Sequence, residues 1–199
     1  MRSHYDMEQG FPKTTHRCDK CLSKISSAET ILERFREVLG GAIESSHIDR
    51  YENGKRKKKI EKIWLIIPRD RLRDAVAMVA NLQSPPHLAV ASGSDLGDRI
   101  EILYHFQVFW GFGSDTTMTI TIGTTCPKDD PRIPTITDIV PGALITEREK
   151  QEFLGVVIEN IPDSRRLFLT ENVPEKTYPW RKDETGVEDM VKDVHKEGE

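Results

Sequence analysis

The spacing of prolines divides this chain into two parts of different character. Up to Ile122, apolar residues recur at regular intervals. From Cys126 onward, closely spaced prolines interrupt the chain at positions 127, 131, 134 and 141. Proline lacks a backbone N–H and disrupts both the interior of a helix and a central strand. We therefore predict a regular fold in the first part. The last third holds too little apolar material for a core of its own, so we expect it to lie extended over a surface.

The first part has the pattern of a mixed helix-and-strand fold. Ser26 and Glu29 have the spacing of a capping box, apolar residues follow at helical spacing, and Gly40-Gly41 ends the helix. A second apolar stripe predicts a helix over 69–82. Alternating and β-branched runs predict strands over 42–51, 58–67, 88–92, 99–110 and 116–122.

The order of these elements predicts an α+β fold: a mostly antiparallel sheet with helices packed on one face, followed by an extended C-terminal segment. Asn53-Gly54 is a strong hairpin signal because both residues tolerate positive φ. A short helix over 143–154 is closed by Gly155. The predicted division is a polar N-terminal arm over 1–25, an α/β core domain over 26–155, an extended partner-binding segment over 156–183 and a charged mobile tail over 184–199.

Charge and hydropathy narrow the classes of function. The formal net charge is −4, whereas a general nucleic-acid binder is usually basic over at least one face. The longest uncharged run, from Ala75 to Ser94, contains two adjacent prolines, so we expect no transmembrane helix. The N-terminus is polar and lacks the apolar stretch of a signal peptide, and the three cysteines do not form a disulfide framework. We expect a cytoplasmic protein.

Cys18 and Cys21 form a Cys-x-x-Cys pair. Such a pair supplies two thiolates to zinc or forms a redox dithiol, which makes a stand-alone zinc or dithiol protein an alternative function. Structural zinc needs four ligands, and only His16 and the distant Cys126 are candidates to complete the set. The alternative interpretation is a pair that faces a partner or has no role.

The run Lys55-Arg56-Lys57-Lys58-Lys59 places five cations beside the predicted hairpin turn. It suits nucleic acid, anionic lipid or an acidic partner, and a nucleic-acid binding module is a second alternative. No aromatic residues interleave with the cations, which favours a solvated hairpin tip that charge protects from aggregation.

Gly111-Phe112-Gly113 lacks the rest of a dinucleotide fingerprint, and the carboxylates and histidines form no recognisable catalytic pair. We expect no catalytic, cofactor-binding or metal site in this chain.

The most specific feature is an ordered set of short motifs in the last third. These motifs are Pro134 to Asp138, Pro141 to Ala143, Glu147 to Glu149, Leu154 to Val156, Pro162 to Leu167 and Pro179 to Asp183. In order and spacing they resemble the 30-kDa subunit of respiratory complex I, the NADH:quinone oxidoreductase, and the matching subunit of membrane-bound energy-converting hydrogenases. Gln151, Glu152, Ile161 and Glu184 depart from the usual pattern. These departures are similar to an archaeal branch whose complexes take electrons from ferredoxin.

The resemblance implies a non-catalytic, peripheral subunit of an ion-translocating redox complex. Such a subunit docks on a large subunit that resembles a nickel-iron hydrogenase, beside a small iron-sulfur subunit, and is held on the cytoplasmic side of the membrane through these partners and, indirectly, the membrane arm. Iron-sulfur clusters are expected in the neighbouring subunits. Our hypothesis is that charged residues of the motifs clamp the large subunit, although some should instead form internal ion pairs. These residues are Glu147, Arg148, Glu149, Arg165, Arg166, Arg181, Lys182 and Asp183.

Overall fold

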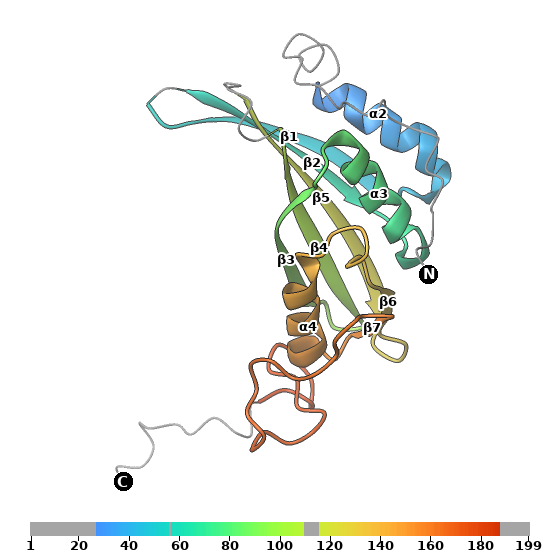
Figure 1. Ribbon diagram of the computed structural model, residues 1–199, viewed down its shortest axis with the longest axis vertical. Helices are drawn as coiled ribbons and strands as arrows, with labels where there is room; N and C mark the ends of the chain where they lie inside the picture. Colours follow the sequence, from blue (N-terminus) through green and yellow to red (C-terminus); the bar gives the residue numbers. More distant parts are fainter. Residues whose placement is uncertain (1–26, 56, 110–115, 188–199) are drawn as a thin grey trace.

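The computed structural model describes residues 27–55, 57–109 and 116–187, and places a five-stranded sheet at the centre of an elongated molecule (Figure 1). The N-terminal half contains α2 (Ala28–Leu39), a 3-10 turn (Gly40–Ala42), β1 (Ser45–Asn53), β2 (Lys58–Ile66), a second 3-10 turn (Arg69–Arg71) and α3 (Leu72–Leu82). The remainder contains β3 (His87–Asp95), β4 (Arg99–Val108), β5 (Thr116–Pro127), β6 (Arg132–Pro134), α4 (Ala143–Leu154) and β7 (Val157–Glu159).

The strands of the large sheet lie in the order β1-β2-β5-β4-β3. Strands β1 and β2 form one antiparallel hairpin and β3 and β4 a second. Strand β5 lies between the hairpins, antiparallel to β4 but parallel to β2. A mostly antiparallel sheet is therefore confirmed. The parallel β2–β5 pair was not predicted.

Burial alternates along the strands because the helices cover one face of the sheet. On β4, Tyr104 and Phe106 are fully buried, whereas their neighbours are only half-buried. Cross-strand partners share a face, and the partners of these two residues on β5 are the buried Ile122 and Ile120. The apolar stripes of α2 and α3 supply the other side of this core, and the Tyr104 hydroxyl meets a side chain of α4. The prediction of helices on one face is confirmed.

The opposite face of the sheet carries a row of half-buried polar and aromatic side chains. His105 on β4 bonds through Nε2 to Ser92 Oγ at 2.9 Å and through Nδ1 to Thr121 Oγ1 at 3.0 Å. Trp64 meets the His105 ring edge-on at a centroid distance of 6.1 Å, and His47 stacks on Trp64 at 5.8 Å. Burial and the nearby charge of Lys62 lower the pKa of His105. His105 is therefore a packed structural histidine.

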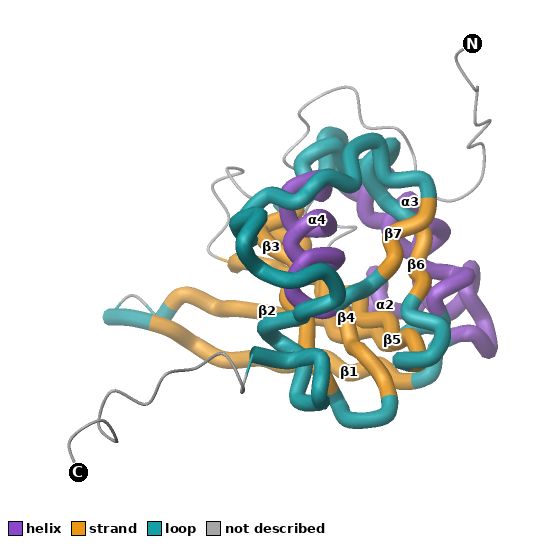
Figure 2. The backbone as a smooth tube through the Cα atoms, turned by 90° about the horizontal axis from the view of Figure 1, so that it is seen from below, coloured by secondary structure: helices purple, strands orange, loops and turns teal. Residues whose placement is uncertain are grey.

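Several element boundaries differ from the prediction. Ser27, not Ser26, caps the first helix, because its side chain accepts a bond from the Thr30 N–H at 3.2 Å. Strand β5 continues to Pro127, well past the predicted end at 122, because its last residues still pair with β4. Strands β6 and β7 form a separate parallel pair beside α4 that the sequence did not predict (Figure 2). Each has only three residues, too few for a periodic signal.

The hairpin turn is confirmed, with Gly54 at a φ of +71° directly after β1. The β1–β2 hairpin and the C-terminal loops lie at opposite ends of the molecule (Figure 1). Within the described ranges, every helix is too short or too polar to span a membrane.

Candidate partner interface

Helix α4 joins the sheet to the C-terminal segment, here defined as residues 156–187. Its sequence is mostly polar, yet Glu147, Arg148, Lys150 and Glu152 are all buried. The helix ends at Gly155, which adopts a φ of +67° and donates its N–H to the Gln151 carbonyl at 3.0 Å. A charged side chain is buried only where partners replace its water. The following contacts identify those partners.

Glu147 points towards the sheet and ties it to the loop before α4. One carboxylate oxygen accepts bonds from the Tyr104 hydroxyl at 3.3 Å and the Ile136 N–H at 3.0 Å, and the other accepts a bond from Thr135 Oγ1 at 2.6 Å. Burial raises the pKa of Glu147, although these three donors act in the opposite direction. The carboxyl group therefore serves to position the backbone of 135–136 against β4.

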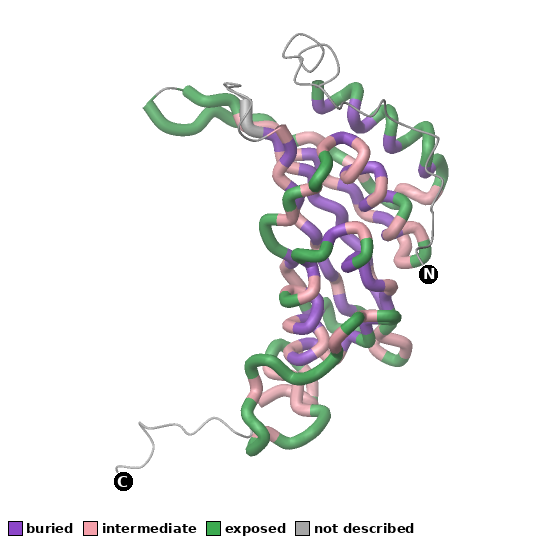
Figure 3. The backbone as a smooth tube through the Cα atoms, in the orientation of Figure 1, coloured by how far each residue is buried: buried purple, intermediate pink, exposed green. Residues whose placement is uncertain are grey.

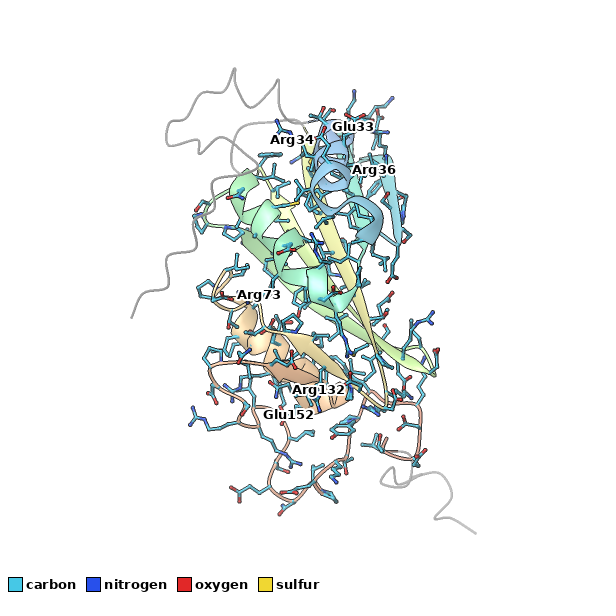
Figure 4. All side chains as sticks on the ribbon, turned by 90° about the vertical axis from the view of Figure 1, so that its right-hand side faces the viewer. Glu33, Arg34, Arg36, Arg73, Arg132 and Glu152 are labelled. Atoms are coloured by element: carbon cyan, nitrogen blue, oxygen red, sulfur yellow. The ribbon has the colours of Figure 1, made fainter. Side chains whose placement is uncertain are left out.

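The loop that contains residues 135–138 is also held from the helix α3 side. Arg73 donates to both carboxylate oxygens of Asp138, at 2.7 and 2.6 Å, and to the Thr135 carbonyl at 2.6 Å (Figure 4 labels Arg73). The hydrogen bond from Arg73 lowers the pKa of Asp138. Such a two-pronged contact fixes both the distance and the orientation of the loop.

Arg148 and Glu152 hold the backbone of residues 165–169 from two sides. The Arg148 guanidinium donates to the Arg165 carbonyl at 2.7 and 3.0 Å and to the Arg166 carbonyl at 3.2 Å. Glu152 accepts bonds from the N–H groups of residues 167, 168 and 169 at 2.6–3.1 Å. Burial alone raises the pKa of Glu152, but these N–H groups outweigh it and the pKa is lowered. We call residues 165–169 the gripped loop (Figure 4 labels Glu152).

A second cluster fixes the chain near residue 183. The Lys128 ammonium lies 2.7 Å from Asp95 and 2.6 Å from Asp183, and the Lys182 N–H donates to Asp95 at 2.8 Å. Burial opposes ionisation of both carboxyl groups, but Lys128 and further hydrogen bonds together outweigh it, so that the pKa of each lies below its ordinary value. These further bonds come from the Lys182 and Gly97 N–H groups at Asp95 and from Thr185 at Asp183. This cluster ties the end of β3 and the residue after β5 to the far end of the C-terminal segment.

Aromatic and arginine contacts fill the space between these two attachments. Arg181 donates through Nε to the Leu154 carbonyl at 2.8 Å and lies over the Tyr178 ring at 5.0 Å. Trp180 contacts Phe153 at a centroid distance of 4.7 Å, and the Lys150 ammonium lies 4.9 Å from the Trp180 ring centroid. The C-terminal segment is thus attached to α4 at two places, residues 163–169 and 180–181.

The eight residues predicted to contact a partner all make contacts within this chain. Glu147, Arg148, Arg181 and Asp183 have the internal partners described above, and Lys182 contributes its backbone N–H. Glu149 forms an ion pair with the neighbouring Lys150. Arg165 and Arg166 are exposed: Arg165 pairs with Asp163 at 2.8 Å, and Arg166 donates to the carbonyls of Thr170, Val173 and Pro174. Contact of any of the eight residues with a partner stays a prediction.

A surface hollow beside α4 was not predicted from the sequence. Its lining includes the apolar residues Leu88 and Val90 of β3, Ile145 of α4 and Phe168 of the gripped loop, together with Glu149 of α4. Phe168 is 50% exposed, although its ring contacts Phe153 at 5.4 Å. The only sequence signal was the apolar triplet of residues 167–169 in an otherwise polar stretch. Its exposure depends on contacts from α4 that periodicity does not reveal.

The other predicted features give no chemical site in the part of the chain that is described. Cys18, Cys21 and His16 lie outside the described residues, as does Arg56 of the basic run. Cys126 is a buried free cysteine, and burial raises the pKa of its thiol to about 11, so it is protonated at neutral pH. Within the described ranges, no group of three or more His, Cys, Asp and Glu residues is arranged to hold a metal ion.

A family model described as respiratory-chain NADH dehydrogenase, 30 Kd subunit, matches residues 65–189, from β2 through the whole C-terminal segment. The chain belongs to this family. The match confirms the resemblance that the motifs of the last third indicated.

Relatives of this 30-kDa subunit family member are subunits of several kinds of oxidoreductase complex. Membrane-bound hydrogenase subunit beta of Pyrococcus furiosus is 36% identical over 135 residues, which cover 67% of this chain and 77% of the relative. NADH-quinone oxidoreductase subunit 5 of Thermus thermophilus is 26% identical over 129 residues, which cover 61% of this chain and 60% of the relative. A chain in the structure of an archaeal membrane-bound sulfane sulfur reductase shares the fold, with a TM-score of 0.57, 21% identity, and coverage of 79% of this chain and 85% of that one.

Proposed function

We propose that this family member is a non-catalytic, peripheral subunit of a membrane-bound, ion-translocating redox complex. In this proposal it docks through its C-terminal segment on the large subunit that resembles a nickel-iron hydrogenase, beside a small iron-sulfur subunit. The complex holds it on the cytoplasmic side of the membrane. Electrons pass through iron-sulfur clusters of the neighbouring subunits, and this chain contributes no cofactor. The relatives named above, subunits of a membrane-bound hydrogenase and of an NADH-quinone oxidoreductase, support the class of complex.

The observation that carries the proposal is the structure of the C-terminal segment. Apart from β7 it contains no regular secondary structure, yet buried charged side chains of α4 fix residues 163–169 and the Lys128 cluster fixes residues 182–183. Most residues of the segment are exposed to solvent (Figure 3). A loop that is rigid without forming a core is pre-organised for contact, because its ordering cost is not incurred when a partner binds.

Purification of the complex from its native host through a tag on this chain tests the proposal. We expect the large subunit and the small iron-sulfur subunit to co-purify in equal amounts with the tagged chain. Charge reversal of the exposed pair, Arg165→Glu with Arg166→Glu, should reduce the recovery of these subunits, because reversed charges repel the surface that the original pair contacts. Recovery of the tagged chain alone, or of a chain that turns over a substrate unaided, would contradict the proposal.

A matched control reverses two charges at the opposite end of the molecule. Lys58 and Lys59 lie at the start of β2 near the hairpin tip and are both exposed. Lys58→Glu with Lys59→Glu changes the net charge by the same amount as the Arg165 and Arg166 reversal. We expect normal recovery of the complex from this control. If both double variants lost the complex equally, the effect would reflect net charge rather than docking by the C-terminal segment.

A further inference from the structure

The β1–β2 hairpin concentrates positive charge at one end of the molecule. Residues 52–59, here called the basic tip, contain the five cations of positions 55–59 and one carboxylate, Glu52. The basic tip therefore carries a formal charge of +4, whereas the rest of the chain carries −8. It precedes residues 65–189, which the family model matches, so membership of the family does not account for it. Such a separation of charge orients a molecule near a charged surface.

The described part of the basic tip projects from the body of the molecule. Strand β5 pairs with β2 from Lys59 onward, and among the described strands Asn53 and Lys58 pair with each other alone. A hydrogen bond from the Lys57 N–H to the Gly54 carbonyl at 3.1 Å closes the turn. Figure 1 shows the hairpin extending past the helices, at the end away from the C-terminal segment. The docking proposed above therefore leaves the basic tip accessible.

The lysines of the basic tip leave their charge available to a partner. Those at positions 55 and 57–59 are exposed, and none of them forms an ion pair with a described residue. Arg50, nearer the body on the same hairpin, is instead paired with Glu29 of α2 and Glu61 of β2. Because successive side chains of a strand point to opposite faces, the cations surround the tip and do not line one side of it.

The composition of the basic tip discriminates between classes of anionic partner. Protein interfaces are enriched in aromatic residues and depleted in lysine, whereas the basic tip has four lysines, one arginine and no aromatic residue. Its eight residues are also far fewer than the roughly 20–30 that each side of a stable protein interface contributes. Proteins that bind single strands stack bases on aromatic residues, and duplex binders are basic over a whole face. Lipid headgroups require neither feature, because charge alone holds lysine clusters at an anionic membrane surface.

We propose that the basic tip binds the anionic phosphate headgroups of the membrane to which the complex is attached. This inference rests on the proposed function, which holds the chain at a membrane, and it adds a direct contact with lipid to the contacts with partner subunits. The basic tip has no apolar side chain to insert between lipids, so the contact is electrostatic and reversible. The same surface repels the acidic remainder of the chain, so that the basic tip approaches first.

Vesicle binding by the purified full chain tests the contact. In about 0.1 M salt the chain should sediment with vesicles that contain phosphatidylglycerol, but not with vesicles of phosphatidylcholine alone. Lys58→Gln with Lys59→Gln should lower the partition coefficient about 25-fold, because each lysine near an anionic surface strengthens binding about fivefold. Lys58→Arg with Lys59→Arg keeps the charge and should bind normally. Equal binding by the glutamine variant and the unaltered chain, or no preference for phosphatidylglycerol, would overturn the inference.

The control removes two cations from the other end of the sheet. Along β5, Lys59 pairs with Thr116 at the beginning and Arg99 with Pro127 at the end, about 35 Å away. Arg132 follows that end, and the side chains of Arg99 and Arg132 are 52% and 63% exposed. Arg99→Gln with Arg132→Gln should bind vesicles within about twofold of the unaltered chain, because charges beyond a Debye length are screened. An equal loss in this control would mean that net charge, not the basic tip, determines binding.

Two further measurements separate lipid from other anionic partners. Sodium phosphate and sodium chloride of equal ionic strength should release the chain from vesicles equally, whereas selective release by phosphate would indicate a site for the free ion and overturn the inference. A photoreactive residue in place of Asn53 keeps every cation and should crosslink to lipid when the complex is in its native membrane. A crosslink to a protein subunit, or tighter binding of the chain to duplex DNA than to the anionic vesicles, would also overturn the assignment to lipid.

Failure of this inference is distinguishable from failure of the proposed function. The Lys58 and Lys59 charge-reversal variant should recover the partner subunits normally in detergent, yet it should not bind anionic vesicles. If the tagged chain recovers its partner subunits but the purified chain binds no vesicles, this inference alone is wrong. If the tagged chain recovers no partner subunit, the proposed function itself fails.

Discussion

The two ends of this molecule are held together by different forces. From α2 to β5, a layer of helices lies on one face of the sheet, and the buried side chains are almost entirely apolar. From α4 onward, the chain is fixed by charged side chains that bind backbone groups and each other. Apolar burial depends little on pH, whereas the second kind of contact requires ionised groups. The comparison predicts that the C-terminal segment can be released while the sheet stays folded.

Substitution in the sheet should produce the largest effect. Phe106 is fully buried on β4 beneath the helices, so Phe106→Ala leaves a cavity and should lower the free energy of unfolding by about 3–5 kcal/mol. Denaturant unfolding of the full chain, followed by circular dichroism, measures the change. Tyr51→Ala, at an exposed position, should stay within about 0.5 kcal/mol of the unaltered chain. A loss of similar size in both variants would mean that burial of the side chain does not determine its contribution to the stability of the sheet.

A fall in pH should destabilise the C-terminal segment more than the sheet. The pKa values of Glu152, Asp95 and Asp183 are lowered in the folded chain, so their contribution to stability is present above the ordinary carboxyl pKa and is lost as the pH falls below about 4. Glu147 has the opposite sign: its raised pKa favours folding at low pH, and that contribution is lost as the pH rises through the raised value.

The C-terminal segment should therefore be released first as the pH is lowered. In NMR spectra recorded from pH 7 to pH 2, amide signals of residues 165–183 should lose their folded positions at a higher pH than those of β4. Glu152→Gln should already weaken the gripped loop at pH 7 and reduce its dependence on pH, because the amide cannot ionise. Simultaneous loss of both sets of signals would show that the two regions unfold as one unit.

A smaller effect is expected at the end of α4. Gly155 has a φ of +67°, and an added Cβ would lie 2.5 Å from the Tyr178 ring, so Gly155→Ala should cost about 1–2 kcal/mol and loosen the contact of Tyr178. Gly142, at the other end of the same helix, has a φ of −64° and open space around it. Gly142→Ala should change stability by less than about 0.5 kcal/mol. Equal melting temperatures for the two variants would contradict the importance of this packing.

The sequence predicted the parts of the fold that depend on local pattern. The Asn53-Gly54 turn, the helix that ends before Gly40 and the α4 boundary at Gly155 all follow from residues that act within a few positions. The parallel pairing of β2 with β5 could not be predicted from the sequence, because an apolar strand pattern does not specify which strand lies beside it.

For the predicted interface, the sequence indicated a segment but not the direction in which its side chains point. Arg148 and Arg165 both belong to charged motifs, yet one is buried beneath the gripped loop and the other is almost fully exposed. Phe168 shows the reverse case, an apolar residue held at the surface by the buried Glu152. A buried arginine and an exposed phenylalanine arise here from contacts between distant positions, and periodicity along the chain does not record such contacts.

The position of β5 has a consequence for how the protein is made. This central strand begins only at Thr116, after both hairpins that it joins have been synthesised. On the ribosome, the β1–β2 and β3–β4 hairpins therefore emerge as two separate ribbons with unpaired inner edges until β5 inserts between them. We expect nascent chains that end before residue 116 to require chaperone protection. The C-terminal segment follows β5 in the chain, so its contacts with α4 form only after the last strand of the sheet has been synthesised.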